Sequence, residues 1–124
     1  MNSLIDQLKN IVGAAQVLTE GDLSAWEQEW RKRVRGKALA VVRPGSTDEV
    51  SKLVKACAAA GTSIVPQGGN TGLVVGSIPD ESGTEVVLSL QRLNQVRGID
   101  KDNLTITVEA GCVLHVRMRL KAKT

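Results

Sequence analysis

The stretch Val65-Pro66-Gln67-Gly68-Gly69-Asn70-Thr71-Gly72-Leu73-Val74 places three glycines within five positions, directly after a short apolar strand predicted over 63–65. Glycine accepts a positive φ without a steric penalty, and it lets a ligand approach the main chain closely. Successive main-chain N–H groups in such a turn can converge on an anion, and Asn70 and Thr71 add side-chain donors. The stretch therefore indicates a binding site for a phosphate or a pyrophosphate.

The glycines alone leave a second interpretation open, namely a tight turn between two buried strands. The spacing matches neither of two common nucleotide-binding patterns, because the stretch has no Gly-x-Gly-x-x-Gly and no Lys-Ser or Lys-Thr pair after the glycines. The choice between the two interpretations depends on the segments on either side of the loop.

Those segments predict an α/β fold that contains a β-α-β unit and further strands. Ser46 and Glu49 have the spacing of a capping box, and Gly61 provides the stop of the same helix. The segment 104–109 alternates apolar and polar residues, so one face of this strand is expected to be buried. The expected elements are a helix over 48–60 and strands over 38–42, 63–65, 86–90 and 104–109. The expected inner face of the helix is Val50, Leu53, Val54, Cys57 and Ala58.

Two helical segments are expected before this unit. Residues 3–14 have the apolar stripe of an amphipathic helix. Trp26 and Trp30 are four residues apart, a spacing that places both indoles on one face of a second helix. These segments are interpreted as structural anchors for the sheet that follows.

The order of the segments resembles the N-terminal FAD-binding subdomain of FAD-linked oxidoreductases of the p-cresol methylhydroxylase / vanillyl-alcohol oxidase type. The branch that it resembles most contains D-lactate, glycolate and D-2-hydroxyglutarate dehydrogenases. The resemblance extends over residues 26–112 and rests on four motifs: Arg43-Pro44, the loop 66–74, the segment 88–94 and Glu109-Ala110-Gly111. It implies an α/β (α+β) fold, the first subdomain of this type of FAD-binding domain.

In this family the glycine loop wraps the pyrophosphate of FAD through main-chain N–H groups. The resemblance therefore implies FAD as the cofactor. Glycine suits this role, because a dianionic pyrophosphate needs many close donors in a water-poor pocket. Leu73 is expected near the adenine or the ribose. The expected cofactor-binding residues are Pro66, Gln67, Gly68, Gly69, Asn70, Thr71, Gly72, Leu73, Gly76 and Ser77.

The resemblance also implies a reaction in which hydride passes from the α-carbon of a 2-hydroxy acid to N5 of the flavin. In the family the catalytic base, any metal ligands and the substrate-binding arginines lie beyond the part that this chain matches. The sequence therefore assigns no catalytic and no metal-binding residue. A 2-hydroxy-acid substrate is expected only for the full-length enzyme, and whether this chain alone is an enzyme stays open.

Three parts are expected along the chain: a helical lead segment over 1–37, a partial FAD-binding subdomain over 38–114, and a basic tail over 115–124 that departs from the family pattern. The family continues with a second glycine-rich loop and more sheet, so we expect the chain to be truncated. A truncated chain exposes apolar surface that the missing half normally covers. Self-association through that surface is therefore expected.

Composition excludes several other functions. The net charge of +3 comes with no Phe, no Tyr and two Trp, which argues against a nucleic-acid-binding protein. No apolar run approaches the roughly 20 residues of a membrane span. The first residues lack the basic start of a signal peptide, so a cytoplasmic location is expected. Cys57 and Cys112 lack a partner at metal-ligand spacing and are expected to be free thiols.

Two alternatives belong to other classes of function. In the first, the chain is a non-catalytic α/β interaction module whose exposed sheet edge pairs with a partner or a second copy. In the second, the glycine loop binds a nucleotide other than FAD. A tight homodimer that is unaffected by flavin favours the first alternative. Competition among ATP, NAD and FAD tests the second.

Overall fold

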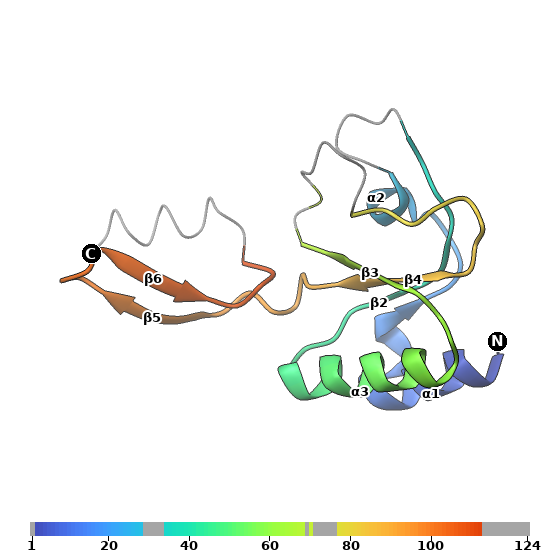
Figure 1. Ribbon diagram of the computed structural model, residues 1–124, viewed down its shortest axis with the longest axis horizontal. Helices are drawn as coiled ribbons and strands as arrows, with labels where there is room; N and C mark the ends of the chain where they lie inside the picture. The colour runs from blue at the N-terminus through green and yellow to red at the C-terminus, as the bar shows by residue number, and fades with distance from the viewer. Residues whose placement is uncertain (1, 29–33, 69, 71–76, 113–124) are drawn as a thin grey trace.

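The computed structural model describes residues 2–28, 34–68, 70 and 77–112 of the 124-residue chain, and the statements below concern these residues. Figure 1 shows a layered body, from which a two-stranded hairpin projects to one side. The helices are α1 (Asn2–Val12), the short 3-10 helix η1 (Ala14–Gln16), α2 (Ser24–Glu27) and α3 (Thr47–Ala59). The strands are β1 (Val17–Leu18), β2 (Ala38–Val42), β3 (Ile64–Gln67), β4 (Glu85–Ser89), β5 (Val96–Asp100) and β6 (Thr105–Val108).

The body is built on a four-stranded sheet in the order β1-β2-β4-β3. Strands β2, β4 and β3 are parallel, and β1 pairs antiparallel with β2. Helices α1 and α3 lie together on one face of this sheet, while α2 lies on the other face (Figure 1). Strands β5 and β6 form a separate antiparallel hairpin.

The main core lies between the sheet and the layer of α1 and α3. Leu8, Leu53 and Cys57 are fully buried there against Val42 and Leu88 of the sheet. A smaller cluster on the opposite face joins Leu23, Ala38, Val41 and Val87. Because residues of α1 belong to the main core, the lead segment packs against the same sheet as the predicted subdomain.

Helix α3 begins and ends as its sequence predicts. Ser46 Oγ accepts a hydrogen bond from the main-chain N–H of Glu49 (3.1 Å), so it is the N-cap. The Glu49 carboxylate accepts from the N–H of Gly45 (2.7 Å), one residue earlier than in a standard capping box. Gly61 has φ 66°, a left-handed conformation that suits glycine and ends the helix.

The inner face of α3 is narrower than predicted. Leu53 and Cys57 are buried and Val50 is partly buried, whereas Val54 is 44% exposed and Ala58 is exposed. The prediction was therefore wrong for Val54 and Ala58, which lie at the solvent side of the stripe. Burial raises the pKa of the Cys57 thiol, so this free cysteine stays neutral.

The predicted α/β class and the strand over 38–42 are confirmed. The strand after α3 is parallel to β2 as predicted, but the two are not neighbours, because β4 lies between them. In a crossover through α3 the chain skips one position in the sheet, and β4 later fills it. Strand β4 therefore has a parallel strand hydrogen-bonded on each side. This central position explains why Val86, Val87 and Leu88 are buried.

Three other expectations need correction. Helix α2 ends at Glu27, and Gln28 is extended (φ −115°, ψ 135°), so a helical face that includes both Trp26 and Trp30 is wrong; Trp30 itself lies outside the described residues. Strand β5 was not predicted. The apolar face of β6 is only half-buried, and Leu104 just before it is 78% exposed.

Within the described residues, none of the helices combines the length and the apolar content that crossing a membrane requires.

Candidate functional site at the carboxyl edge of the sheet

The three parallel strands end together at one edge of the sheet. The register pairs Val42 of β2 with Leu88 of β4, and Gln67 of β3 with Ser89 of β4. Ligands of open α/β sheets bind outside the carboxyl ends of the strands. The glycine loop starts at this edge, because Gly68 follows the last residue of β3.

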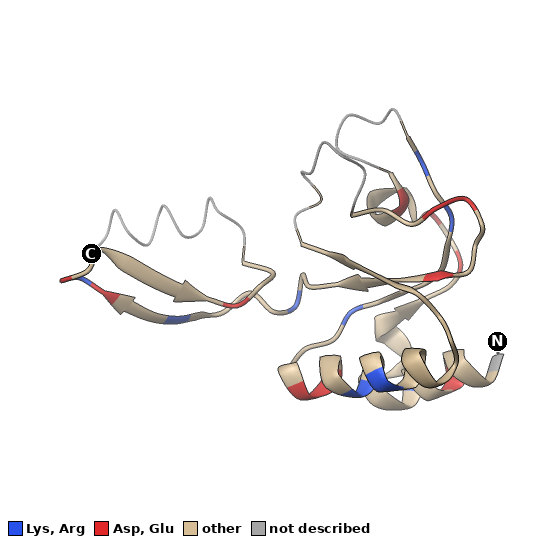
Figure 2. Cartoon of the chain, in the orientation of Figure 1, with Lys and Arg blue, Asp and Glu red and all other residues tan. Residues whose placement is uncertain are grey.

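The four motifs of the sequence analysis meet at this edge. The N–H of Leu90, after β4, donates to Gln67 O (2.9 Å). The side chain of Arg92 donates from Nη1 to Arg43 O (2.8 Å) and joins the exit of β4 to the exit of β2. Figure 2 shows basic positions on the links that leave both strands.

The motif Glu109-Ala110-Gly111 closes the same edge. The N–H of Gly111 donates to Leu93 O (2.8 Å), and a Cβ at Gly68 would lie 3.8 Å from Ala110 O. The start of the glycine loop therefore lies beside the chain that returns from β6. Segments that are up to about 70 residues apart in the sequence come together here, as residues 43 and 111 show.

The side chain of Gln67 holds the base of the loop. It is 2% exposed, and its Nε2 donates to Trp26 O and to Ser77 O, both at 2.8 Å. Trp26 belongs to α2, and Ser77 lies where the loop returns. Both hydrogens of the Gln67 side-chain amide are therefore used inside the protein, while its predicted role through the main-chain N–H stays a prediction.

Asn70 makes a similar set of contacts one step further into the loop. Its Nδ2 donates to Gln28 O (2.7 Å) and to Ala25 O (3.2 Å), and its Oδ1 accepts from Ser77 Oγ (2.8 Å). Its main chain is left-handed, with φ 55°. The expected side-chain donor of Asn70 is therefore already occupied by contacts within the protein.

The structure describes half of the predicted cofactor-binding residues. Pro66 is exposed within β3, Gln67 is buried, and Gly68, Asn70 and Ser77 are half-buried around the base of the loop. The structure brings these five together. The other predicted residues lie outside the described part of the chain, and their roles stay predictions; they are Gly69, Thr71, Gly72, Leu73 and Gly76.

Sequence reasoning missed the contribution of α2. The oxygen atoms that hold Gln67 and Asn70 are main-chain carbonyls of Ala25, Trp26 and Gln28, which lie more than 40 positions earlier. A carbonyl oxygen has no signature in the sequence. The signal that could have helped is the pair of amide side chains in the loop, since an amide offers donors and an acceptor at once.

The edge suits an anionic cofactor. Arg43 Nε and Ser89 Oγ are buried there and have no hydrogen-bond partner in the described part of the chain. Buried donors without partners are rare and point to a missing ligand atom or water. A cationic donor and a hydroxyl donor at this edge suit the charge and the acceptor oxygens of a pyrophosphate.

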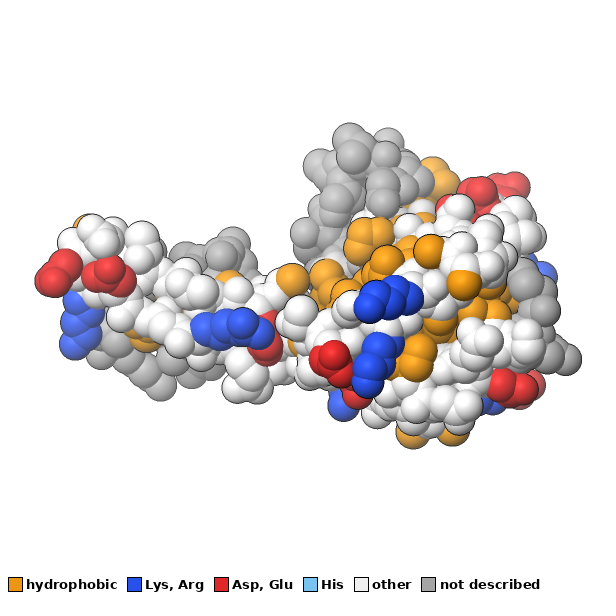
Figure 3. Space-filling view, turned by 60° about the horizontal axis from the view of Figure 1, so that its bottom comes forward, with side chains coloured by type: hydrophobic (Ala, Val, Ile, Leu, Met, Phe, Trp, Pro, Cys, Tyr) orange, Lys and Arg blue, Asp and Glu red, His pale blue; other side chains and the backbone are white. Residues whose placement is uncertain are grey.

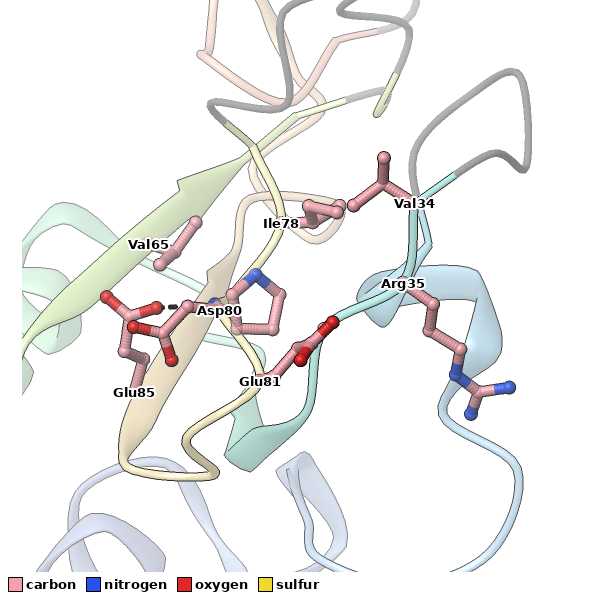
Figure 4. Close-up of a pocket in the computed structure, with 9 residues that line it drawn as sticks. Val34, Arg35, Val65, Ile78, Asp80, Glu81 and Glu85 are labelled. Atoms are coloured by element: carbon pink, nitrogen blue, oxygen red, sulfur yellow. Dashed lines mark hydrogen bonds between the residues drawn. The ribbon is translucent and has the colours of Figure 1, made fainter.

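A separate cavity of about 480 Å³ lies beside the loop exit (Figure 4). Asp80, Glu81 and Glu85 line it, and the N–H of Asp80 donates to Glu85 Oε1 (2.7 Å). Figure 4 shows the guanidinium of Arg35 pointing away from these carboxylates. Three carboxylates repel a phosphate, so this cavity is a poor site for the anionic part of a nucleotide.

Charges elsewhere on the described residues are mixed. Figure 2 shows acidic and basic positions interspersed over the body and the hairpin. Among the described residues, no group of three or more His, Cys, Asp or Glu side chains is placed to hold a metal ion. The described residues thus favour the edge of the sheet as the site.

The carboxylate of Glu109 fixes the base of the β5–β6 hairpin next to this edge. It accepts from the N–H of Gln95 (3.0 Å) and from Arg97 Nη2 (3.0 Å). The Gln95 bond first, and then Arg97, hold the pKa of Glu109 below its usual value of 4.5, because both contacts favour the charged form. The stabilising effect of the charged Glu109 carboxylate is therefore fully present above the usual pKa of 4.5. It is lost as the pH falls through the lower pKa of the folded state.

We expect an NMR titration of the Glu109 carboxyl carbon to show a midpoint below 4.5. Arg97→Met should raise the midpoint only in part, because the larger cause, the Gln95 N–H, remains. A midpoint at or above the usual value in the unsubstituted protein would contradict this geometry.

Comparison with known proteins identifies the family to which this chain belongs. Residues 38–122 match the model of a family described as the FAD binding domain. The chain is 42% identical over 93 residues to the D-2-hydroxyglutarate–pyruvate transhydrogenase of Saccharomyces cerevisiae. The aligned region covers 75% of this chain and 18% of that protein. It is 36% identical over 118 residues to a putative mitochondrial D-lactate dehydrogenase of Schizosaccharomyces pombe. Here the aligned region covers 89% of this chain and 22% of that protein.

Solved structures share the same fold. The structure of p-cresol methylhydroxylase with bound substrate matches 98% of this chain and 24% of its own, with a TM-score of 0.79 and 21% identity. This likeness confirms the p-cresol methylhydroxylase-type fold that the motifs implied.

The chain therefore belongs to the family of FAD-binding domains, and FAD is its cofactor. It spans about a fifth of the length of the curated relatives that it matches, as the 18% and 22% coverages show. The cofactor that the family resemblance implied, FAD, is thus confirmed at the level of the family.

Proposed function

We propose that this chain is the FAD-binding portion of a flavin-dependent 2-hydroxy-acid dehydrogenase. The loop 66–73 holds the FAD pyrophosphate through its main-chain N–H groups, with Arg43 and Ser89 as further donors at the edge of the sheet. The observation that supports this most is the meeting of four motifs at the carboxyl edge, in a chain of the FAD-binding family.

Each described residue has a distinct part in this proposal. Gly68 provides open main chain, because nothing lies closer than 3.8 Å to the position of an added Cβ. Asn70 presents its main-chain N–H from a left-handed conformation. The positive charge of Arg43, with its buried and unpartnered Nε, would balance part of the charge of the pyrophosphate.

When FAD is bound, its chemistry is to accept hydride at N5 from the α-carbon of the substrate. The substrate class follows from the relatives, whose names include D-2-hydroxyglutarate and D-lactate. In the full-length enzyme the groups that bind the 2-hydroxy acid and take its hydroxyl proton come from other segments. The share of this chain is to bind and orient the cofactor.

A pair of matched glycine substitutions tests the proposal. Gly68→Ala adds a methyl group where the ligand approaches but where the protein has space. Gly98→Ala makes the same change on the hairpin, where nothing lies within 4 Å. Calorimetry and flavin fluorescence should show FAD affinity weakened at least about tenfold by Gly68→Ala, a loss of ~1.4 kcal/mol, and unchanged by Gly98→Ala.

Equal FAD affinity for the two variants would overturn the assignment of the loop. Competition with ATP and NAD at the same concentrations distinguishes a flavin site from a general nucleotide site. A homodimer that forms equally well with and without FAD, in a protein without saturable FAD binding, would favour the interaction module instead.

The remaining expectations also stand as proposals. We keep the division into a lead segment 1–37, a subdomain 38–114 and a tail 115–124, of which 113–124 lie outside the described residues. A cytoplasmic location is proposed as well; several relatives are named as mitochondrial, so fractionation of cells that express a tagged protein is the test.

Self-association is proposed through exposed apolar side chains. Figure 3 shows hydrophobic side chains at the surface of the layer formed by α1 and α3. The large exposed hydrophobics among the described residues are Val34, Val54, Ile99 and Leu104. Sedimentation at increasing concentration tests this proposal, and a monomer throughout would contradict it.

A further inference from the structure

We propose that residues 25–28, which precede the part matched by the family model, position the glycine loop for FAD. Together with Gln67, Asn70 and Ser77 they form a unit that we call the α2 clamp. This inference rests on the proposed function of the loop and adds positioning residues to it. It extends the cofactor site to a segment that begins 13 residues before the family match at residue 38.

The first step is the chemistry of the contacts between α2 and the loop. The last carbonyl groups of a helix lack partners within the helix. The amide hydrogens of Gln67 and Asn70 supply partners to Trp26 O, Ala25 O and Gln28 O, at 2.8, 3.2 and 2.7 Å. The end of α2 and the start of the loop therefore satisfy each other.

The second step is the closure of the loop at its base. Ser77 O accepts from Gln67 Nε2, and Ser77 Oγ donates to Asn70 Oδ1, both at 2.8 Å. The side chains of Gln67 and Asn70 thus join three points of the chain: α2, the outgoing arm of the loop and its returning arm. Loss of either amide removes a link between α2 and the returning arm at Ser77.

The third step is the anchoring of α2 itself. Glu27 is 6% exposed; its Oε2 accepts from the N–H of Ala38 (2.8 Å) and its Oε1 from Arg35 Nη2 (2.9 Å). Its main-chain oxygen accepts from the N–H of Gly36 (2.8 Å). A buried carboxylate with these partners fixes α2 to the first residue of β2. The α2 clamp is therefore held in a fixed position relative to the sheet.

Pre-positioned N–H groups bind an anion more tightly, because the loop does not have to be ordered when the ligand arrives. Loss of the clamp should therefore weaken FAD binding more than it weakens the fold. A merely structural role for the same contacts would lower stability and leave the affinity of the folded protein unchanged.

The experiment compares clamp variants with a core variant on the far side of the sheet. Gln67→Met removes both hydrogen bonds from a buried position while it keeps the length of the side chain. Val50→Ala, on the outer side of the α1–α3 core, serves as the control for lost stability. The two measurements are FAD affinity by calorimetry and the free energy of unfolding in urea without FAD.

We expect Gln67→Met to weaken FAD affinity about tenfold, the effect of losing two hydrogen bonds of ordinary strength. Val50→Ala should leave affinity within about twofold, whatever its loss of stability. Ser77→Ala removes one contact of the clamp and should weaken affinity by a smaller factor, which keeps the test valid if Gln67→Met does not fold.

A second pair of variants tests the anchor. Glu27→Ala leaves the N–H of Ala38 without its acceptor, whereas Glu27→Gln keeps an acceptor oxygen and should restore part of the FAD affinity. Hydrogen exchange of the Asn70 side-chain amide, which donates to Ala25 O and Gln28 O, should be faster in Glu27→Ala and Gln67→Met than in Val50→Ala.

The clamp is refuted if Gln67→Met, Ser77→Ala and Glu27→Ala keep the affinity of the unsubstituted protein, or if Val50→Ala weakens affinity as much at equal loss of stability. The Gly68→Ala variant separates this failure from that of the proposed function. If Gly68→Ala weakens FAD binding and the clamp variants do not, the loop binds FAD without help from α2.

Discussion

Gly111→Ala is expected to destabilise the protein by about 3 kcal/mol or more, because the new methyl group has no space. A Cβ at Gly111 would lie 1.6 Å from Leu90 O and 2.9 Å from Leu93 O. Both obstacles are main-chain atoms, which cannot turn aside as a flexible side chain does. Urea unfolding followed by circular dichroism measures the loss.

The control for this prediction is Gly98→Ala, since that glycine has open space around it. It should change the free energy of unfolding by no more than about 0.5 kcal/mol. If Gly111→Ala is as stable as this control, the return of the chain from β6 does not pack against the exit of β4 as described.

Leu53→Ala is expected to cost about 2–5 kcal/mol, the usual range for truncation of a buried leucine. Leu53 is 1% exposed and lies in the core between α3, α1 and the sheet. The adjacent Val54 is 44% exposed, so Val54→Ala is the matched control and should cost no more than about 0.5 kcal/mol.

Thermal unfolding of the two variants measures this difference. The comparison also tests the correction made to the sequence-based face of α3, in which Val54 was expected inside. Equal costs for Leu53→Ala and Val54→Ala would mean that α3 is rotated from the orientation described here.

Local signals in the sequence were enough to predict much of the subdomain. The strand over 38–42 and the capped helix after it follow from apolar runs, Ser46 and Gly61, all of which act over a few residues. The glycine loop was also recognisable, because glycine content and a preceding strand are local features.

Features that depend on distant contacts were not predictable in the same way. The insertion of β4 between β2 and β3 is a choice of pairing partner, and hydrophobic pattern alone does not encode it. The strand β5 has one half-buried residue and four exposed ones, so it gives no buried-strand signal. The early end of α2 reflects tertiary contacts, since the extended Gln28 offers its carbonyl oxygen to Asn70.

The candidate site shows the same division. Its location at the loop was predicted. Which groups of the loop contact the rest of the protein, and which remain for a ligand, was not. Gln67 was expected to donate through its main-chain N–H, and Asn70 through its side chain as well. In the structure the amide side chains of both residues contact α2 and Ser77. This leaves main-chain N–H groups, with Arg43 and Ser89, as the donors that the edge offers to a ligand.

The most direct test of a pyrophosphate site at this loop is a two-dimensional ¹H–¹⁵N NMR titration with FAD, ADP and riboflavin. ADP contains the pyrophosphate without the flavin ring, and riboflavin contains the ring without any phosphate. The amide signals of Gly68 and Asn70 should shift on addition of FAD and ADP and stay in place with riboflavin. Shifts confined to the cavity lined by Asp80 and Glu85, or equal shifts of Gly68 and Asn70 with riboflavin, would contradict a pyrophosphate site at the loop.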